Sequence, residues 1–146
     1  MSEDELSALN LEDDFRATLT TPGVTRWKLE KVGPLEVWAT MSSARAPGEL
    51  FQARLLWRVY PGEPPSVKFR DPASGRLDAT CAWPRVRGFR PTSFDTCVNW
   101  SLEGFGLHPE WRTDPRFRWD PHGNVLLKVL TYLQSELDDY LEGRHP

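Results

Sequence analysis

Residues 51–59 alternate between two sets of side chains, and this pattern leaves the chain few ways to fold. One set is apolar: Phe51, Ala53, Leu55, Trp57 and Val59. The intervening set is mostly polar: Gln52, Arg54, Leu56 and Arg58. Successive side chains of a β-strand point to opposite faces of a sheet, so the alternation predicts one buried and one mostly solvated face. Such strands are typical of an antiparallel meander.

Three further segments extend this strand into a predicted four-stranded meander. The first strand is expected over about 24–32, with Trp27 and Leu29 on one face, and Gly33-Pro34 predicts the turn after it. In the second strand, alternate positions carry Leu35, Val37, Ala39 and Met41. A short strand over 67–69 follows a proline-rich turn, and its brevity predicts the edge of the sheet.

A helix is predicted at each end of the chain. Over 6–20 apolar side chains recur every four residues, at Leu11, Phe15 and Leu19. We expect Asn10 to cap that helix. Asp120 and Pro121 predict the start of the last helix, and Gly143 predicts its end. The last helix has a wide apolar stripe that predicts packing on the sheet: Leu126, Val129, Leu130, Leu133, Leu137, Tyr140 and Leu141.

The stretch between the meander and the last helix, residues 70–119, has no clear periodicity and is rich in turn formers. Long ordered loops of this kind tend to carry function. Both cysteines, Cys81 and Cys97, lie within it. We therefore expect any active site to lie in this loop.

Length and charge limit the function classes. The 146 residues suffice for one core, so we expect a single domain over 1–146. The net charge of −3 argues against a nucleic-acid partner bound through its phosphates. The short basic cluster of Arg85, Arg87 and Arg90 predicts a solvated loop, and a contact patch for an acidic partner is the alternative.

Two features predict a cytoplasmic protein with no membrane partner. No apolar run approaches the roughly 20 residues that span a bilayer. The acidic start, residues 1–5, lacks the basic and apolar regions of a signal peptide. In a reducing compartment Cys81 and Cys97 are expected to be free thiols, and each is a candidate for chemistry.

Two motifs resemble segments of the ubiquitin-conjugating enzyme family. Residues 60–69 read Tyr-Pro-Gly-Glu-Pro-Pro-Ser-Val-Lys-Phe, similar to the Tyr-Pro-x-x-Pro-Pro-x-Val-x-Phe segment between the third and fourth strands of that family. Trp119-Asp120-Pro121 resembles the Trp-Ser-Pro sequence before its second helix. The resemblance implies an α+β ubiquitin-conjugating-type fold, with an N-terminal helix, a four-stranded antiparallel meander, a long active-site loop and a C-terminal helix packed on the sheet.

The resemblance also implies a nucleophilic cysteine between the two motifs. Cys97 fits that position better than Cys81, and for either residue the alternative is a small buried side chain. Family members usually carry His-Pro-Asn upstream of the cysteine, where the Asn stabilises the oxyanion. This chain has Arg90-Pro91-Thr92 instead. In this respect it resembles short, divergent bacterial members, which implies a role in antiviral defence.

Three residues are candidates to assist Cys97. Asn99 would share a face with the thiol in an extended segment and could donate to an oxyanion. His108 is the best titratable group for proton transfer near neutral pH, and Asp95 is a third candidate. For each of them the alternative is ordinary hydrogen bonding within the loop.

The resemblance implies a transferase that accepts a ubiquitin-like modifier as a thioester on Cys97 from an activating enzyme and passes it to an amine, with a target protein or ligase as a further partner. It implies a partner-facing surface supported by the turn and the start of the last helix: Tyr60, Pro61, Pro64, Pro65 and Trp119. No metal or small cofactor is expected, because the activating enzyme would use the ATP. The alternatives are a non-catalytic module of the same fold that binds a ubiquitin-like protein, and a structural adaptor.

Two other site types receive weaker support from the residue types alone. Cys81, Cys97, His108 and His122 lack the short paired spacings of a zinc site. A hydrolase built from Cys97, His108 and Asp120 is conceivable, but short chains with several His and Asp commonly offer such triples.

Overall fold

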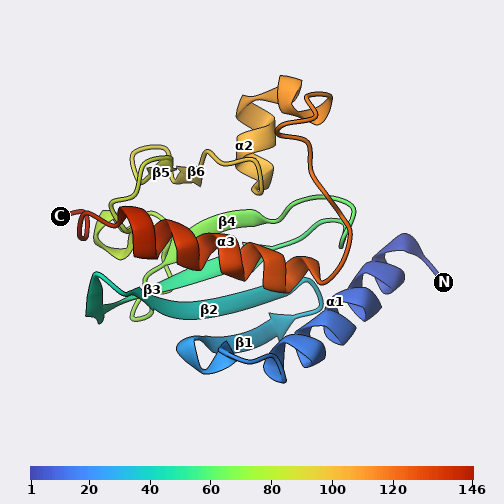
Figure 1. Ribbon diagram of the computed structural model, residues 1–146, viewed down its shortest axis with the longest axis horizontal. Coiled ribbons are helices and arrows are strands. Elements are labelled where there is room, and N and C mark those ends of the chain that lie inside the picture. The colour runs from blue at the N-terminus through green and yellow to red at the C-terminus, as the bar shows by residue number, and fades with distance from the viewer.

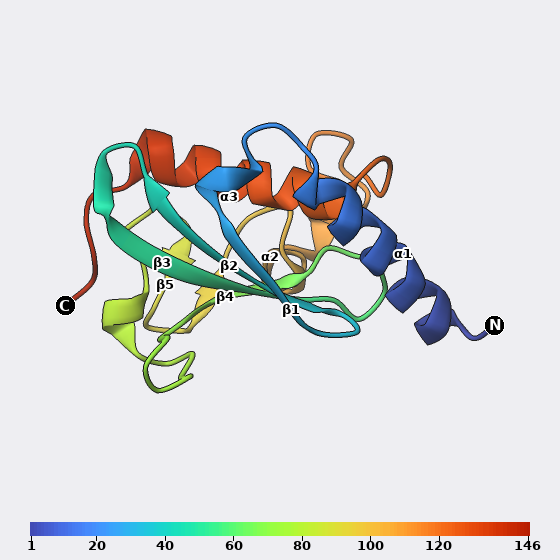
Figure 2. The same ribbon diagram turned by 90° about the horizontal axis from the view of Figure 1, so that it is seen from below.

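A four-stranded antiparallel sheet forms the centre of the protein in the computed structural model, which describes residues 1–146. The strands lie side by side in chain order: β1 (Lys28–Gly33), β2 (Glu36–Ser43), β3 (Ala46–Leu56) and β4 (Ser66–Arg70). Helix α3 (Val125–Tyr140) crosses one face of the sheet and contacts α1 (Glu3–Leu19) (Figure 1). Figure 2 shows the sheet beneath α3, with the free end of α1 extending beyond it. The predicted α+β architecture is confirmed.

The strand register brings alternate residues onto one buried face. Val37 lies opposite Leu55, and Ala53 lies opposite Phe69. All four are 0% exposed, and they share one core with α3 residues Leu126, Val129, Leu130, Leu133 and Leu137. Full burial of such a leucine contributes roughly 2 kcal/mol. The predicted alternation in β2 and β3 and the edge position of β4 are therefore confirmed.

Helix α1 starts at Glu3, eight residues before Leu11, which would be its first residue if Asn10 were the cap. Ser2 is the N-cap, because its hydroxyl accepts from the Glu5 amide while the Glu5 carboxylate accepts from the Ser2 amide. The prediction that Asn10 caps this helix is wrong, since Asn10 lies inside it. Within the predicted stripe Leu11 is fully buried, whereas Leu19 is 48% exposed.

Helix α3 begins at Val125, later than predicted. Asn124 is its N-cap and accepts from the Leu127 amide at 3.0 Å. The prediction that Asp120 and Pro121 start the helix is wrong, because the Asp120 carboxylate binds His122 and Lys128 instead. At the other end the helix stops at Tyr140, before Gly143. Tyr140 is 58% exposed and does not join the buried stripe.

The bounds of two strands also differ from the prediction. Residues Val24–Arg26 form one turn of 3₁₀ helix, so β1 begins only at Lys28. Strand β3 begins at Ala46 and ends at Leu56, before Val59. Pairing of β2 with β3 reaches back to Ser43 and Ala46, which lengthens β3 at its start.

The long stretch before α3 is more regular than its sequence predicted. It contains η2 (Thr80–Ala82), β5 (Phe89–Arg90), β6 (Asp95–Thr96), α2 (Leu102–Leu107) and η3 (Pro109–Arg112). Strands β5 and β6 form a separate two-stranded sheet, and both β6 and α2 contact the edge strand β4. The elements are too short for sequence periodicity to reveal them.

None of the helices combines the length and the apolar character that crossing a lipid bilayer requires.

Candidate functional site

Cys97 directly follows β6, and its backbone is held in place on both sides. Its amide donates to the Gly88 carbonyl oxygen at 2.7 Å. The preceding residue, Thr96, is fully buried, and its hydroxyl donates to the Val67 carbonyl oxygen of β4 at 3.1 Å. The thiol is therefore presented from a segment anchored to the edge of the central sheet.

Ser101 joins the Cys97 segment to α2. Its buried hydroxyl donates to the Thr96 carbonyl oxygen at 2.6 Å and accepts from the Gly104 amide at 3.0 Å, which makes it the N-cap of α2. A Cβ atom on Gly104 would lie 1.9 Å from the Val98 carbonyl oxygen. Only glycine permits this approach, so α2 and the Cys97 segment pack backbone against backbone.

The same elements cover the free edge of β4. The Glu103 carboxylate accepts from the Val67 amide at 2.8 Å, and the Leu102 amide donates to the Pro65 carbonyl oxygen at 2.7 Å. These bonds satisfy polar groups that an edge strand otherwise leaves unpaired. They also attach the loop that carries Cys97 to the sheet.

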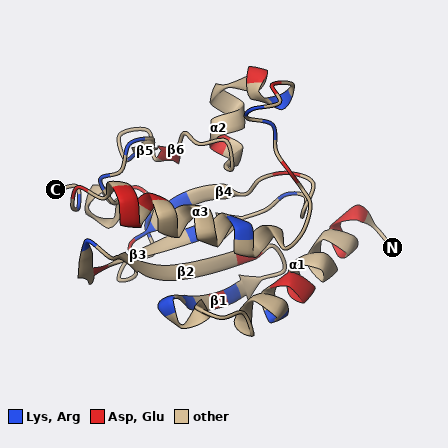
Figure 3. Ribbon diagram, viewed as in Figure 1, with Lys and Arg blue, Asp and Glu red and all other residues tan.

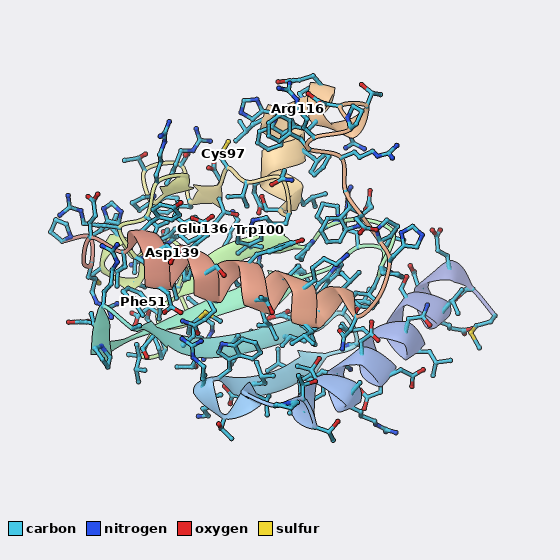
Figure 4. All side chains as sticks on the ribbon, in the orientation of Figure 1. Phe51, Cys97, Trp100, Arg116, Glu136 and Asp139 are labelled. Atoms are coloured by element: carbon cyan, nitrogen blue, oxygen red, sulfur yellow. The ribbon has the colours of Figure 1, made fainter.

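The two thiols lie in different surroundings. Cys97 is half-buried, and Figure 4 shows its sulfur pointing away from the central sheet between β6 and α2. Cys81 is exposed on η2, where the Arg144 guanidinium donates to its carbonyl oxygen at 2.9 Å. Both are free thiols. Cys97 alone lies on the segment anchored to β4.

Asp95 and Arg90 form an ion pair beside Cys97. The Arg90 Nε lies 2.7 Å from Asp95 Oδ1, and the two residues lie opposite each other in the β5–β6 pair. The hydrogen bond to Asp95 raises the pKa of the Arg90 guanidinium, and the charges of Asp95 and Cys97 add smaller contributions in the same direction. Asp95 therefore holds Arg90 near the thiol. The other two arginines of the basic cluster, Arg85 and Arg87, are exposed.

The structure does not bring the predicted assistants into contact with the thiol. The Asn99 amide donates to the Phe117 carbonyl oxygen over a long 3.4 Å. His108 stacks on Trp111 with ring centroids 4.3 Å apart, and its Nδ1 lies 3.0 Å from a Glu110 carboxylate oxygen. Neither side chain forms a hydrogen bond with Cys97.

The structure forms neither the triad that the hydrolase hypothesis requires nor the ligand cluster that the zinc hypothesis requires. Asp120 binds His122 at 2.6 Å, whereas His108 binds Glu110, so no His108–Asp120 pair exists. His122 and Lys128 together lower the pKa of the Asp120 carboxyl to about 2. No group of three or more His, Cys, Asp or Glu side chains is placed to hold a metal ion.

The proline-rich turn is anchored from beneath by Tyr60. Tyr60 is 2% exposed, its hydroxyl donates to the Asp14 carboxylate and accepts from the Leu126 amide, and it thereby joins α1 to α3. Burial and the Asp14 carboxylate raise the pKa of this phenol. Tyr60 and Pro65 are buried and support the turn from inside, and their predicted part in partner binding stays a prediction.

Three other residues of that predicted surface are better placed. The Trp119 indole donates to the Pro61 carbonyl oxygen at 2.9 Å, which ties the segment before α3 to the turn. Pro61 and Trp119 are partly exposed, and Pro64 is buried but lines a cavity together with Trp119. Leu102 and Phe105 of α2 line the same cavity.

Several residues that build this site had little signal in the sequence. Ser101 followed by Glu103 is a recognisable helix start, yet six residues of helix are too few for a periodic pattern. The roles of Thr96 and Glu103 depend on β4, which lies about thirty residues earlier in the chain.

Comparison with protein-family models, with curated proteins and with solved structures gives no match to this chain.

Proposed function

We propose that this protein is a ubiquitin-conjugating-type transferase, in which Cys97 accepts a ubiquitin-like modifier as a thioester and passes it to an amine. One observation carries the proposal: a half-buried thiol stands on a segment that hydrogen bonds fasten to the edge of the meander. The helix–meander–loop–helix order and the motif of residues 60–69 support the finer assignment to the ubiquitin-conjugating fold.

The first proposed step is an exchange between thioesters. The Cys97 thiolate attacks the C-terminal carbonyl carbon of the modifier, which is held as a thioester on an activating enzyme. The new C–S bond forms, the old one breaks, and the leaving thiolate of the activating enzyme takes up the proton that Cys97 lost to solvent. Transfer of an acyl group from one thiol to another needs no metal and no redox partner.

The second proposed step transfers the acyl group to an amine. The amine nitrogen attacks the Cys97 thioester, loses a proton, and releases the Cys97 thiolate. Asn99 is the proposed donor to the oxyanion, and its long bond to the Phe117 carbonyl oxygen is weak enough to exchange for a stronger one. In this proposal His108 takes the amine proton after leaving Glu110.

Partner docking in this proposal uses two surfaces. Helix α1 presents an acidic first turn, visible in red in Figure 3, and is proposed to dock the activating enzyme. The surface of Pro61, Pro64 and Trp119 is proposed to face a ligase or target.

Adduct formation tests the proposal. The protein is incubated with ATP and with any activating enzyme and small β-grasp modifier that are encoded beside it, and intact mass is measured without reductant. We expect an adduct of modifier mass that thiol reagents cleave, and that Cys97→Ala abolishes while Cys81→Ala retains. If the activating enzyme loads the modifier but no adduct forms on this chain, the carrier role is refuted. If only Cys81→Ala loses the adduct, Cys81 is the carrier thiol.

The non-catalytic binding module is the second candidate. It is favoured by the absence of an Asn in Arg90-Pro91-Thr92 and by the absence of hydrogen bonds from Asn99 or His108 to the thiol. Under this alternative Cys97→Ala keeps full partner binding and full function. Under the transferase proposal the same variant binds but loses function.

A further inference from the structure

A cavity of about 260 Å³ opens between the proline-rich turn, α2 and the segment before α3. Its apolar walls come from three separate parts of the chain and are formed by Pro64, Leu102, Phe105, Trp119 and Pro121. Phe105 is held by an edge-to-face contact with Trp111, at a centroid distance of 6.1 Å. The Trp119 bond to Pro61 joins the two sides, so the cavity is a built feature of the fold.

Two unpaired guanidinium groups line this cavity. Arg112, at the end of η3, and Arg118 are exposed, and their side chains have neither a hydrogen-bond nor an ion-pair partner. Their neighbour Arg116 is different, because it pairs with Asp114 at 2.9 Å. The acidic residue at the rim, Glu63, is already engaged by Arg58 at 3.0 Å. The cavity therefore has two cationic groups that no group of this chain neutralises.

We propose that this cavity binds an acidic segment of a partner protein, which inserts one bulky apolar side chain and places its carboxylates on Arg112 and Arg118. The volume is below that of common cofactor and drug-sized sites, roughly 300–1,000 Å³, and suits a single side chain. Arginine forms paired hydrogen bonds with carboxylates, and Trp and Arg are enriched among the residues that dominate protein interfaces. The unpaired charges identify the partner as acidic.

This proposal adds a partner chemistry to the partner-facing surface of the proposed function. It rests on the proposed function only for the role that the partner would have in the transfer reaction. No residue of the cavity is part of the Cys97 segment, residues 95–99. Binding is therefore measurable without the activating enzyme, and on Cys97→Ala protein. Loss of adduct formation with intact peptide binding refutes the transferase alone, and the reverse result refutes the cavity proposal alone.

The probe is a fluorescein-labelled Glu-Asp-Phe-Asp-Glu peptide, titrated by fluorescence anisotropy against the full chain carrying Cys97→Ala. We expect saturable binding that weakens as salt increases. Replacing the peptide's Phe by Ala, or its acids by Gln and Asn, is expected to weaken binding about tenfold or more. The Trp119 indole N–H signal in ¹H–¹⁵N spectra is expected to shift during the titration and thereby report the location.

Matched arginine variants complete the test. Arg112→Gln and Arg118→Gln are each expected to weaken binding about tenfold, and Arg87→Gln, which removes the same charge from an exposed loop elsewhere, less than twofold. If Arg87→Gln and Arg118→Gln weaken binding equally, the peptide binds through general charge attraction and the cavity proposal is overturned. It is overturned equally by undetectable binding at millimolar protein, by equal binding of the neutral peptide, or by displacement of the peptide with inorganic phosphate at equal concentration.

Discussion

An alanine at position 104 tests whether α2 and the Cys97 segment form one rigid unit. The added Cβ would lie 1.9 Å from the Val98 carbonyl oxygen and 2.8 Å from its carbonyl carbon. Ordinary contact begins at 3.4 Å, so one of the two backbones must move by about 1.5 Å. No flexible side chain is available to absorb that movement, because both atoms belong to the backbone of Val98.

The size of the effect follows from known costs of overpacking. Inserting a methyl group into a packed site typically lowers the free energy of unfolding by about 1–3 kcal/mol. Because the clash at position 104 is between two backbones, we expect a loss at the upper end, about 3 kcal/mol. For a chain of this length each kcal/mol lowers Tm by about 3 °C, so we expect Gly104→Ala to lower Tm by about 9 °C. Movement of Val98 also displaces its neighbour Cys97.

Thermal unfolding monitored by circular dichroism measures the first effect, and the rate of Cys97 alkylation, read by intact mass in a Cys81→Ala background, measures the second. The control is Gly106→Ala in the same helix, where an added Cβ meets nothing within 4 Å. Since alanine favours helix over glycine, this control is expected to be neutral or to stabilise by up to about 1 kcal/mol. If both variants unfold at the same temperature and alkylate at the same rate, the proposed packing of α2 on the Cys97 segment is wrong.

Three further predictions concern hydrogen bonds. Tyr60→Phe leaves the Asp14 carboxylate and the Leu126 amide without their shared partner, and we expect a loss of about 1–3 kcal/mol in urea unfolding; an unchanged midpoint would contradict the role of Tyr60 as the link between α1 and α3. Ser101→Ala is expected to cost about 1–2 kcal/mol and to change the Cys97 alkylation rate, since one hydroxyl caps α2 and holds Thr96; loss of stability with no change in rate would separate the cap from the thiol. Asp120 has its pKa lowered from 3.8 to about 2, so its contribution to stability is present above pH 4 and is lost as the pH falls through 2. The Tm difference between wild type and Asp120→Asn is therefore expected to shrink as the pH falls below 4 and to vanish below pH 2, and a difference that keeps its full size at pH 2 would refute the assignment.

Much of the central sheet was predictable because its signals are local. The alternation in residues 51–59 requires only that one face of a strand be buried, and Ala53 and Leu55 obey it. The brevity of residues 67–69 correctly indicated the edge position of β4. The start of α3 was not predictable in this way, because Asp120 has two competing partners, His122 and Lys128, whose geometry appears only in three dimensions.

The candidate site also has features that local sequence signals predicted and features that they did not. The sequence placed both cysteines in one long loop, and the preference for Cys97 over Cys81, which came from the resemblance to the ubiquitin-conjugating family, stays a prediction. The immediate environment of Cys97 could not be predicted, because Thr96 and Glu103 bind an edge strand that is distant in sequence. The proposed roles of Asn99 and His108 remain predictions that depend on movement toward the thiol.

The sequence by itself determined the order of the two long helices and the four strands of the central sheet, and the face of the sheet that is buried, since each of these depends on side-chain patterns within a few residues. Only the tertiary structure decided how β4 is covered, why position 104 must be glycine, and that Arg112 and Arg118 line one cavity with Trp119. The physical reason is that unpaired edge groups, backbone contact and unneutralised charge are properties of distant segments brought together, and no local pattern specifies them.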